Sequence, residues 1–202
     1  MPQSSHEREG GTLPPQTPYQ PGGVADSGRV GLPFELSVRG GGLARPITPA
    51  DVPGLLALIS TCYAEYGLTL RVEQDEPHLV DPGAYFSSHG GCLWVVDHDG
   101  GIGASVGVLV GGREAELKTL YVHPQLRHRG LGTALTWHVI DHARAARCRR
   151  LVLWSDTRFV AAHRLYARLG FTQLPGDRPL FDSNDSREYP FEVQLAPQPG
   201  AR

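Results

Sequence analysis

Hydrophobic residues follow two spacings along the chain from Leu43 onward. Apolar runs of strand length occupy residues 43–47, 92–96, 103–110, 115–122, 151–154, 171–174 and 188–195. Helical spacing of apolar residues follows residue 48 and recurs in 130–146 and 159–169, and a short helix is expected near 82–88. This order, β-α-α-β-β-β-α-β-α-β-β, predicts an α+β domain with a mixed sheet and not a regular βαβ repeat.

The ends of these segments carry residues that are typical of helix and strand boundaries. Thr48 and Pro49 suit the first turn of a helix, and Asp51 suits the positive end of its dipole. Gly170 is placed to end the helix over 159–169. Residues 97–101 read Asp-His-Asp-Gly-Gly and predict a tight hairpin.

Residues 1–42 differ in composition from the rest. They contain six Pro and nine Gly, a share that is typical of disorder when it is not periodic. Such a segment buries too little apolar surface to offset its chain entropy. We expect a flexible extension over 1–42, a domain over 43–196 and a flexible tail over 197–202. Within the extension, Phe34 and Leu36 are the residues placed to dock on the domain.

Composition excludes several classes of protein. The 202 residues suffice for one ordinary domain, and a net charge of −2 provides no general attraction to nucleic acid or anionic membranes. We therefore expect no nucleic-acid partner and no membrane partner. The sequence shows no signal peptide and no run of roughly 20 apolar residues that would span a bilayer. These features favour a soluble, cytoplasmic protein.

Cysteine and histidine patterns do not indicate a metal site. Cys62, Cys92 and Cys148 are odd in number and lack CxxC spacing, so we expect free thiols. His138 and His142 are four residues apart on a helix, but no third ligand and no HExxH pattern accompany them. No metal is expected.

The candidate chemistry begins at the turn 127–132, which reads Arg-His-Arg-Gly-Leu-Gly. A strand ends just before it, at His123 and Pro124, and a helix follows at once. Unpaired backbone N–H groups at the positive end of a helix dipole attract anions. The glycines allow close approach, and Arg127 and Arg129 add positive charge. A pyrophosphate suits this turn, although a basic turn without a ligand has the same residues.

Two segments in this order resemble the GCN5-related N-acetyltransferase (GNAT) family. The first is Ala-Glu-Leu-Lys-Thr-Leu-Tyr-Val-His-Pro over 115–124, followed by Arg127-x-x-Gly130-x-Gly132. The second is Ala-His-Arg-Leu-Tyr-Ala-Arg-Leu-Gly-Phe over 162–171, which is similar to the family's LYxxLGF helix. The resemblance covers about residues 43–195. It implies the GNAT fold: a mixed, mostly antiparallel central sheet, splayed between its fourth and fifth strands and flanked by about four helices.

The resemblance also implies acetyl-CoA as the donor substrate, lying between the strands 115–122 and 151–154. The pantetheine arm would pair with backbone groups around Leu120 and Val122, and the N–H groups from His128 to Thr133 would take the pyrophosphate. The implied cofactor-binding residues are Leu120, Tyr121, Val122, Arg127, His128, Arg129, Gly130, Leu131, Gly132 and Thr133.

Two catalytic residues follow from the same resemblance. Glu116 stands fourteen residues before Gly130, as does the strand-borne general base of the histone-acetylating members. Tyr166 matches the tyrosine that protonates the departing sulfur. The alternatives are a strand glutamate paired with a nearby Lys or Arg, and a tyrosine packed in the core. Phe159 departs from the family, which often has asparagine there, so Ser155-Asp156-Thr157-Arg158 would have to supply the polar contact.

The sequence therefore predicts an acyltransferase that acetylates a primary amine of a small molecule or an amino-acid-like acceptor. A protein N-terminal or lysine acetyltransferase, and a CoA-binding regulatory module without catalysis, remain as alternatives. The acidic residues Glu65, Glu73, Asp75, Glu76 and Asp81 favour a cationic amine, or are simply solvated loop charges. Tyr63 and Tyr66 line the same region or pack their helix. Family members are often dimers, so a homodimer is possible.

Overall fold

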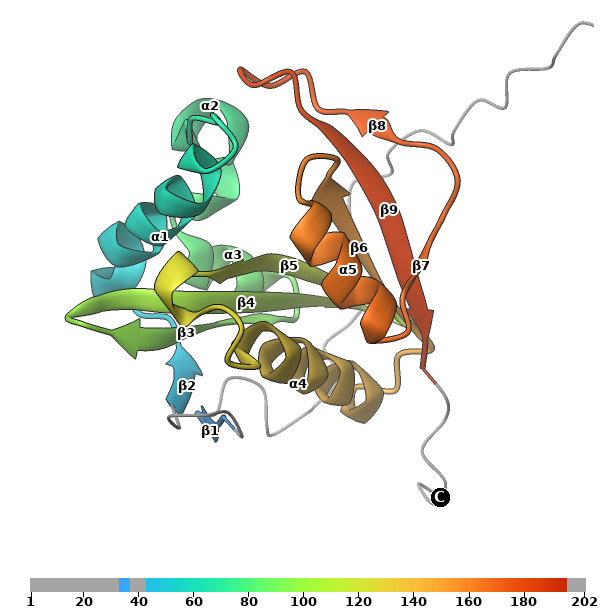
Figure 1. Cartoon of the computed structure of the whole chain (residues 1–202). Coiled ribbons are helices and arrows are strands. Elements are labelled where there is room, and N and C mark those ends of the chain that lie inside the picture. The colour runs from blue at the N-terminus through green and yellow to red at the C-terminus, as the bar shows by residue number, and fades with distance from the viewer. Residues whose placement is uncertain (1–32, 37–42, 196–202) are drawn as a thin grey trace, which may run out of the picture.

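One mixed sheet organises the protein (Figure 1). The computed structural model describes residues 33–36 and 43–195. Nine strands lie within these ranges, in the order β1-β2-β3-β4-β5-β6-β9-β7, with β8 paired to β9. The strands are β1 Phe34–Glu35, β2 Leu43–Pro46, β3 Cys92–His98, β4 Gly101–Gly111, β5 Glu114–Val122, β6 Arg150–Asp156, β7 Thr172–Gln173, β8 Arg178–Pro179 and β9 Arg187–Gln194.

Every pair of neighbouring strands is antiparallel except β5 and β6. The mixed, mostly antiparallel sheet is therefore confirmed. The predicted hairpin joins β3 to β4 through Asp99 and Gly100, whose φ angles are 47° and 77°. Both central residues are left-handed, which is the geometry that Asp-Gly favours in a two-residue turn.

In the part of the chain that the structure describes, five α-helices flank the sheet: α1 Val52–Ala64, α2 Val72–Asp75, α3 Pro82–Ser88, α4 Leu131–Ala145 and α5 Val160–Arg168. Short 3₁₀ helices span Pro49–Asp51, Pro77–Leu79 and Pro124–Leu126. Four of the α-helices were predicted, and α2 lies in a stretch that the sequence did not resolve into an element. The first 3₁₀ turn leads straight into α1. Asp51 fixes this start, because its carboxylate accepts from the Thr48 N–H at 2.8 Å and from Arg45 at 2.7 Å.

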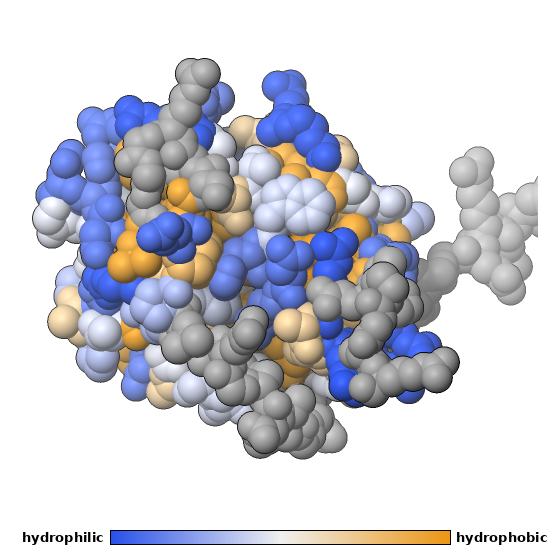
Figure 2. All heavy atoms as spheres, turned by 90° about the horizontal axis from the view of Figure 1, so that it is seen from below, coloured by the Kyte–Doolittle hydropathy of each residue, from blue (hydrophilic) through white to orange (hydrophobic). Residues whose placement is uncertain are grey.

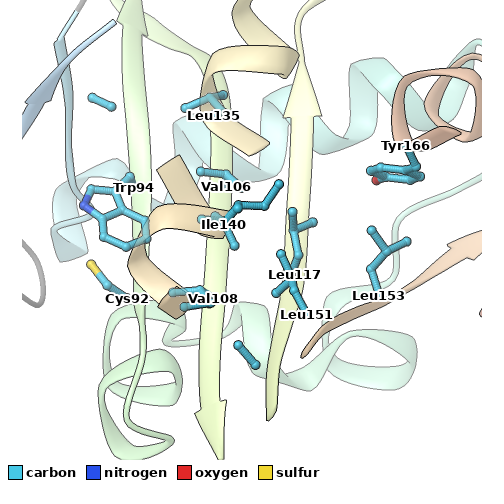
Figure 3. Packing of buried hydrophobic residues seen from close by; sticks show 14 of the residues in the cluster. Cys92, Trp94, Val106, Val108, Leu117, Leu135, Ile140, Leu151, Leu153 and Tyr166 are labelled. Carbon is cyan, nitrogen blue, oxygen red and sulfur yellow. The ribbon is translucent and has the colours of Figure 1, made fainter. Parts of the chain in front are cut away.

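The two faces of the sheet carry different helices (Figure 1). Leu135 and Ile140 of α4 pack with Tyr166 of α5 on one face, over the buried strand residues Leu117 and Leu153 (Figure 3). On the other face, α1 and α3 form a second core that includes Phe86. Cys62, Cys92 and Cys148 are all buried, and all are free thiols as predicted.

The strand β1 lies ahead of the predicted start of the domain. Phe34 stacks on His138 of α4 with ring centroids 3.4 Å apart and planes 3° apart, and Leu36 is 5% exposed. The prediction that Phe34 and Leu36 dock on the domain is confirmed. His138 also meets the Trp94 ring at 4.6 Å, so these aromatic contacts account for the histidine on this helix. The face seen from below mixes hydrophobic areas with larger hydrophilic ones (Figure 2).

Candidate active site

The parallel ladder between β5 and β6 is short. It joins residues 114–116 to residues 150–152, and the two strands then separate (Figure 1). A cavity of about 400 Å³ lies in this opening, lined by β5, the turn before α4, the start of α4, and α5. The predicted splaying of these two strands is therefore confirmed.

A β-bulge in β5 decides which side chains face each side of the sheet. Ser105 of β4 pairs with Tyr121 and Gly107 pairs with Lys118, so β5 holds one extra residue there. Thr119 takes a φ of 55°, and its carbonyl accepts a hydrogen bond from Ser105 Oγ at 2.8 Å. After the bulge, Leu120 and Val122 pack on the α4 side, whereas Tyr121 packs on the α1 side.

The turn before α4 presents unpaired backbone groups to the cavity. His128 has a φ of 62° and Gly130 one of 89°. The first helical hydrogen bond joins Ala134 N–H to the Gly130 carbonyl at 2.9 Å. The N–H groups of residues 131–133 precede that bond and have no partner within the helix. All three residues line the cavity, so the positive end of the α4 dipole faces it.

The arginines around the turn have different surroundings. Arg127 Nη2 forms an ion pair with Glu65 of the α1 end at 2.6 Å, and Arg127 Nε donates to the Val122 carbonyl at 3.0 Å. Arg129 is exposed and Arg168 of α5 lines the cavity. Neither forms an ion pair with any residue in 33–36 or 43–195. Arg127 therefore braces the turn against α1, while Arg129 and Arg168 keep their charge available.

Tyr166 combines core packing with an available hydroxyl. Its side chain is 5% exposed, and its ring lies 5.7 Å from that of Phe171 and 5.6 Å from that of Phe191. The hydroxyl is on the side of the ring that faces β5 (Figure 3). Burial raises its pKa, so the phenol stays protonated well above neutral pH. Within the described ranges, no side chain or backbone group hydrogen-bonds this hydroxyl.

Glu116 lies in β5 at the inner limit of the opening. It is the last β5 residue that pairs with β6, opposite Val152. Its carboxylate is 3.3 Å from Lys118 Nζ. Burial lowers the pKa of Lys118, but the nearby charges, Glu116 first among them, outweigh this and raise it overall. Glu116 is therefore paired with a nearby lysine, as one of the two alternatives expected, and its role as a general base stays a prediction.

An aromatic wall stands where the family often has asparagine. Phe159 lines the cavity, and its ring is 4.8 Å from that of Tyr66. Residues 155–158 do not border the cavity in the described part of the chain, and their contact with the donor stays a prediction. Asp156 instead accepts from Arg158 Nε at 2.8 Å, and Arg158 Nη2 also donates to Ser186 at 2.8 Å. This segment braces the loop between β8 and β9.

The β8–β9 loop is tied to the chain around α2, on the α1 side of the opening. Asn184 exchanges two hydrogen bonds with the backbone of Thr69, both at 2.9 Å. Ser183 Oγ donates to Asp75 at 2.5 Å. We call these contacts the loop clasp. The clasp joins two segments that are more than one hundred residues apart in sequence and that come close to each other above the sheet in Figure 1.

The family follows from comparison of the sequence with known families. A profile of the acetyltransferase (GNAT) family matches residues 55–171, which is more than half of the chain. This chain belongs to the GNAT family. It is an acyltransferase of that family, and the matched region contains β5, the turn before α4, and α5.

Individual GNAT relatives are distant. An uncharacterised N-acetyltransferase of Escherichia coli (strain K12), YjgM, is 29% identical over 136 residues, which cover 64% of this chain and 81% of that protein. A mycothiol acetyltransferase of Thermobispora bispora is 32% identical over 112 residues, 54% of this chain and only 36% of that protein. A GNAT acetyltransferase of Staphylococcus aureus Mu50 superposes with a TM-score of 0.65 at 19% identity, covering 76% and 98% of the two chains. The chain therefore has the GNAT fold.

Most of the predicted GNAT cofactor residues border the cavity. Of the ten, only Arg129 does not. Three further residues line the cavity although no motif indicated them as cofactor contacts: Cys62, Tyr66 and Arg168. The helical spacing of the sequence could have indicated Arg168, because it lies three residues after Leu165 and therefore on the same helix face.

Within the described ranges, no helix has the length and apolar character needed to cross a membrane.

Proposed function

We propose that this protein transfers the acetyl group of acetyl-CoA to a primary amine of a small-molecule acceptor. One observation carries the proposal above all. The free N–H groups of residues 131–133 open into a cavity that continues along β5 into the splayed part of the sheet. A helix N-terminus of this kind suits the pyrophosphate of the donor.

The residues around the cavity fit the donor along its length. Residues 131–133 would hold the pyrophosphate, with the charges of Arg129 and Arg168 close to the same end. Apolar side chains, including Leu120, Val122 and Leu165, suit the pantetheine arm. Acetyl-CoA supplies an acetyl group that is activated as a thioester.

This chain's own groups would support the remaining steps. Backbone N–H groups near the bulge at Thr119 are candidates to stabilise the developing oxyanion. Tyr166 is suited to donate a proton to the leaving sulfur, because burial keeps its hydroxyl protonated. The acceptor would approach from the α1 face, since α4 and α5 cover the other face.

Two features of the α1 face support a small, cationic acceptor. The loop clasp draws together two of the segments that border this face, which restricts access for large acceptors. Glu76 places a carboxylate there, which attracts a protonated amine, whereas the charge of Glu188 is compensated by its ion pair with Arg178. The relative named mycothiol acetyltransferase also supports a small-molecule acceptor.

Thermal unfolding with and without ligand tests the donor. CoA and acetyl-CoA at millimolar concentration should each raise the Tm, because a ligand that binds only the folded state at about 100 times its Kd adds about 2.7 kcal/mol of stability. Adenosine, which lacks the pyrophosphate, is the control and should give no comparable shift. An unchanged Tm in millimolar CoA would contradict the donor site.

Release of the CoA thiol with a panel of amines tests the transfer. The panel should include polyamines, amino acids and a short peptide with a free N-terminus. Tyr166→Phe is expected to lower kcat by about 100-fold or more while the shift in Tm with CoA is retained. CoA binding without thiol release for any amine would favour a regulatory CoA-binding module. Activity on the peptide alone would favour protein acetylation.

A further inference from the structure

Three side chains on the α1 face form a hydrogen-bonded chain. Tyr121 of β5 donates its hydroxyl to Tyr63 Oη at 3.4 Å, and Tyr63 donates to Glu76 Oε1 at 3.1 Å. The two rings meet edge-on with centroids 6.0 Å apart. The residues come from three elements: β5, the end of α1, and the segment between α2 and the following 3₁₀ helix. They are brought together only by the tertiary fold.

Chemistry fixes the direction of this chain. An ionised carboxylate only accepts hydrogen bonds, so Tyr63 must be the donor to Glu76. Tyr63 has a single proton, which means that Tyr121 must donate to Tyr63. The proton of Tyr121 is then committed, and the lone pairs of its oxygen remain free to accept another. Tyr121 lines the cavity between Leu120 and Val122, so the outer end of the hydrogen-bonded chain is a residue of the site where transfer is proposed.

The hydrogen bonds are oriented so that a proton can move from the cavity towards the Glu76 carboxylate. A proton that arrives at Tyr121 Oη can pass on as Tyr121 gives its own proton to Tyr63 and Tyr63 gives its own to Glu76. Each hydroxyl ends with one proton, as it began, and Glu76 ends protonated. Burial raises the pKa of Tyr63 and of Tyr121, so both stay neutral phenols and neither becomes the base itself.

Several charged and titratable groups surround Glu76. Burial raises its pKa, which the hydrogen bond from Tyr63 and the charge of Lys118 oppose, whereas Glu188 and Asp182 raise it further. His78 Nδ1 is 3.5 Å from the carboxylate. Burial first, and then Lys118, lower the pKa of His78 to about 4, so this ring is neutral at pH 7 and the contact is not an ion pair.

Glu116 is in a different position. It forms an ion pair with Lys118 and lies within the closed part of the β5–β6 ladder, before the strands separate. Tyr121 lies five residues beyond Glu116, the last residue of the closed ladder, which is roughly 15 Å of extended chain. Tyr121, not Glu116, therefore borders the open part of the site.

We propose that Glu76 receives, through Tyr63 and Tyr121, the proton that the acceptor amine loses on acetylation. This inference rests on the function proposed above. In the net reaction a protonated amine nitrogen loses two protons and gains the acetyl carbon. The CoA sulfur loses the acetyl carbon and gains one proton, and the other proton is the one that Glu76 receives. Glu76 and Tyr63 act through Tyr121 and do not contact the amine.

The dependence of kcat on pH tests the inference. Glu76 accepts a proton only when it is ionised, so kcat of the unmodified protein should fall as pH drops through the pKa of Glu76, above the usual range for glutamate. Glu76→Gln should lower kcat by about 100-fold and remove this acid limb. Tyr63→Phe should also lower kcat, because it breaks the chain at its centre.

Control measurements separate a proton path from a structural role. Glu35→Gln is the control for Glu76→Gln, because Glu35 is an exposed carboxylate on the edge strand β1, and it should leave kcat and its pH profile unchanged. The shift in Tm with CoA should be equal in all variants. Glu76→Gln should not lower the Tm at pH 8, since it removes a charge whose burial is unfavourable.

Three outcomes would overturn the inference. The first is a pH profile for Glu76→Gln that matches that of the unmodified protein. The second is an acid limb that disappears in Glu116→Gln instead, which would assign the proton to Glu116. The third is an unmodified protein that binds CoA but acetylates no amine, which overturns the proposed function together with the inference. The first two leave the proposed function intact.

Discussion

At the scale of single residues, the side chain that the fold tolerates at Gly132 is different from the one that the cofactor site tolerates. A Cβ atom added there would lie 3.3 Å from Leu165 Cδ2 and 3.8 Å from Val122 Cγ2. A small movement of a flexible leucine side chain would relieve the first contact. Both neighbours line the cavity, so a side chain larger than a methyl group would extend into it.

Gly132→Ala and Gly132→Val should therefore differ. Alanine is favoured over glycine in a helix by about 1 kcal/mol, so Gly132→Ala should keep or raise the Tm and retain the shift with CoA. Gly132→Val should keep the far-ultraviolet circular dichroism spectrum but weaken CoA binding by about tenfold or more, since crowding of this kind costs about 1–3 kcal/mol. If calorimetry showed that Gly132→Val binds CoA as tightly as the unmodified protein, the pyrophosphate could not bind at the start of α4.

At the scale of elements, the sequence predicted those parts of the fold that depend on neighbouring residues. The Asp99–Gly100 hairpin, the capped start of α1 and the glycine turn before α4 each result from local backbone preferences, which composition reveals. The strand-turn-helix context of residues 127–132 also pointed to residues that border the cavity, and their contact with a cofactor stays a prediction.

Elements that depend on distant partners were not predicted. The strand β8 spans only Arg178–Pro179 and exists because it pairs with β9. The ion pair of Arg127 with Glu65 joins a turn to the end of a helix more than sixty residues earlier. The chain from Tyr121 to Glu76 is of the same kind, since no local pattern records a hydrogen bond between elements.

The loop clasp is an element-scale feature with a kinetic consequence. Asn184→Ala removes two hydrogen bonds to Thr69, each worth about 1 kcal/mol or less at an exposed site. We expect a severalfold rise in KM for the acceptor, an unchanged shift in Tm with CoA, and a small loss of stability. Asp185→Asn in the same loop is the control, because Asp185 is exposed and asparagine tolerates its φ of 49°. An unaltered acceptor KM in Asn184→Ala would exclude the clasp from acceptor binding.

At the scale of the whole molecule, the aromatic contacts of α4 link stability to pH. Burial, and next the neighbouring His142, lower the pKa of His138 to about 4, which Asp141 partly opposes. An unfolded histidine titrates near pH 6.5, so between pH 6.5 and 4 the unfolded chain binds more protons than the folded one. The free energy of unfolding should therefore fall as the pH decreases through this window.

Urea unfolding at pH 7 and pH 4.5 measures this effect. His138→Gln should lose part of its stability at pH 7, because the stack on Phe34 is lost, and should show a smaller decrease at pH 4.5 than the unmodified protein. His128→Asn is the control for replacing a histidine at an exposed position. Equal pH dependence in His138→Gln would place the acid-sensitive group elsewhere.

The extra residue in β5 has a consequence for how the two reactants are kept apart. Side chains along a strand alternate between faces, and one inserted residue reverses that alternation for everything that follows. If Thr119 were paired regularly in the ladder, with no bulge, Tyr121 would sit among the aliphatic side chains beneath α4, and an alkyl group would replace the phenol that now contacts Tyr63. Thr119 has no reactive role of its own, yet the bulge that it forms shifts the alternation of β5 side chains by one residue. The strand backbone is thereby left for the donor, and the phenol of Tyr121 faces the acceptor side.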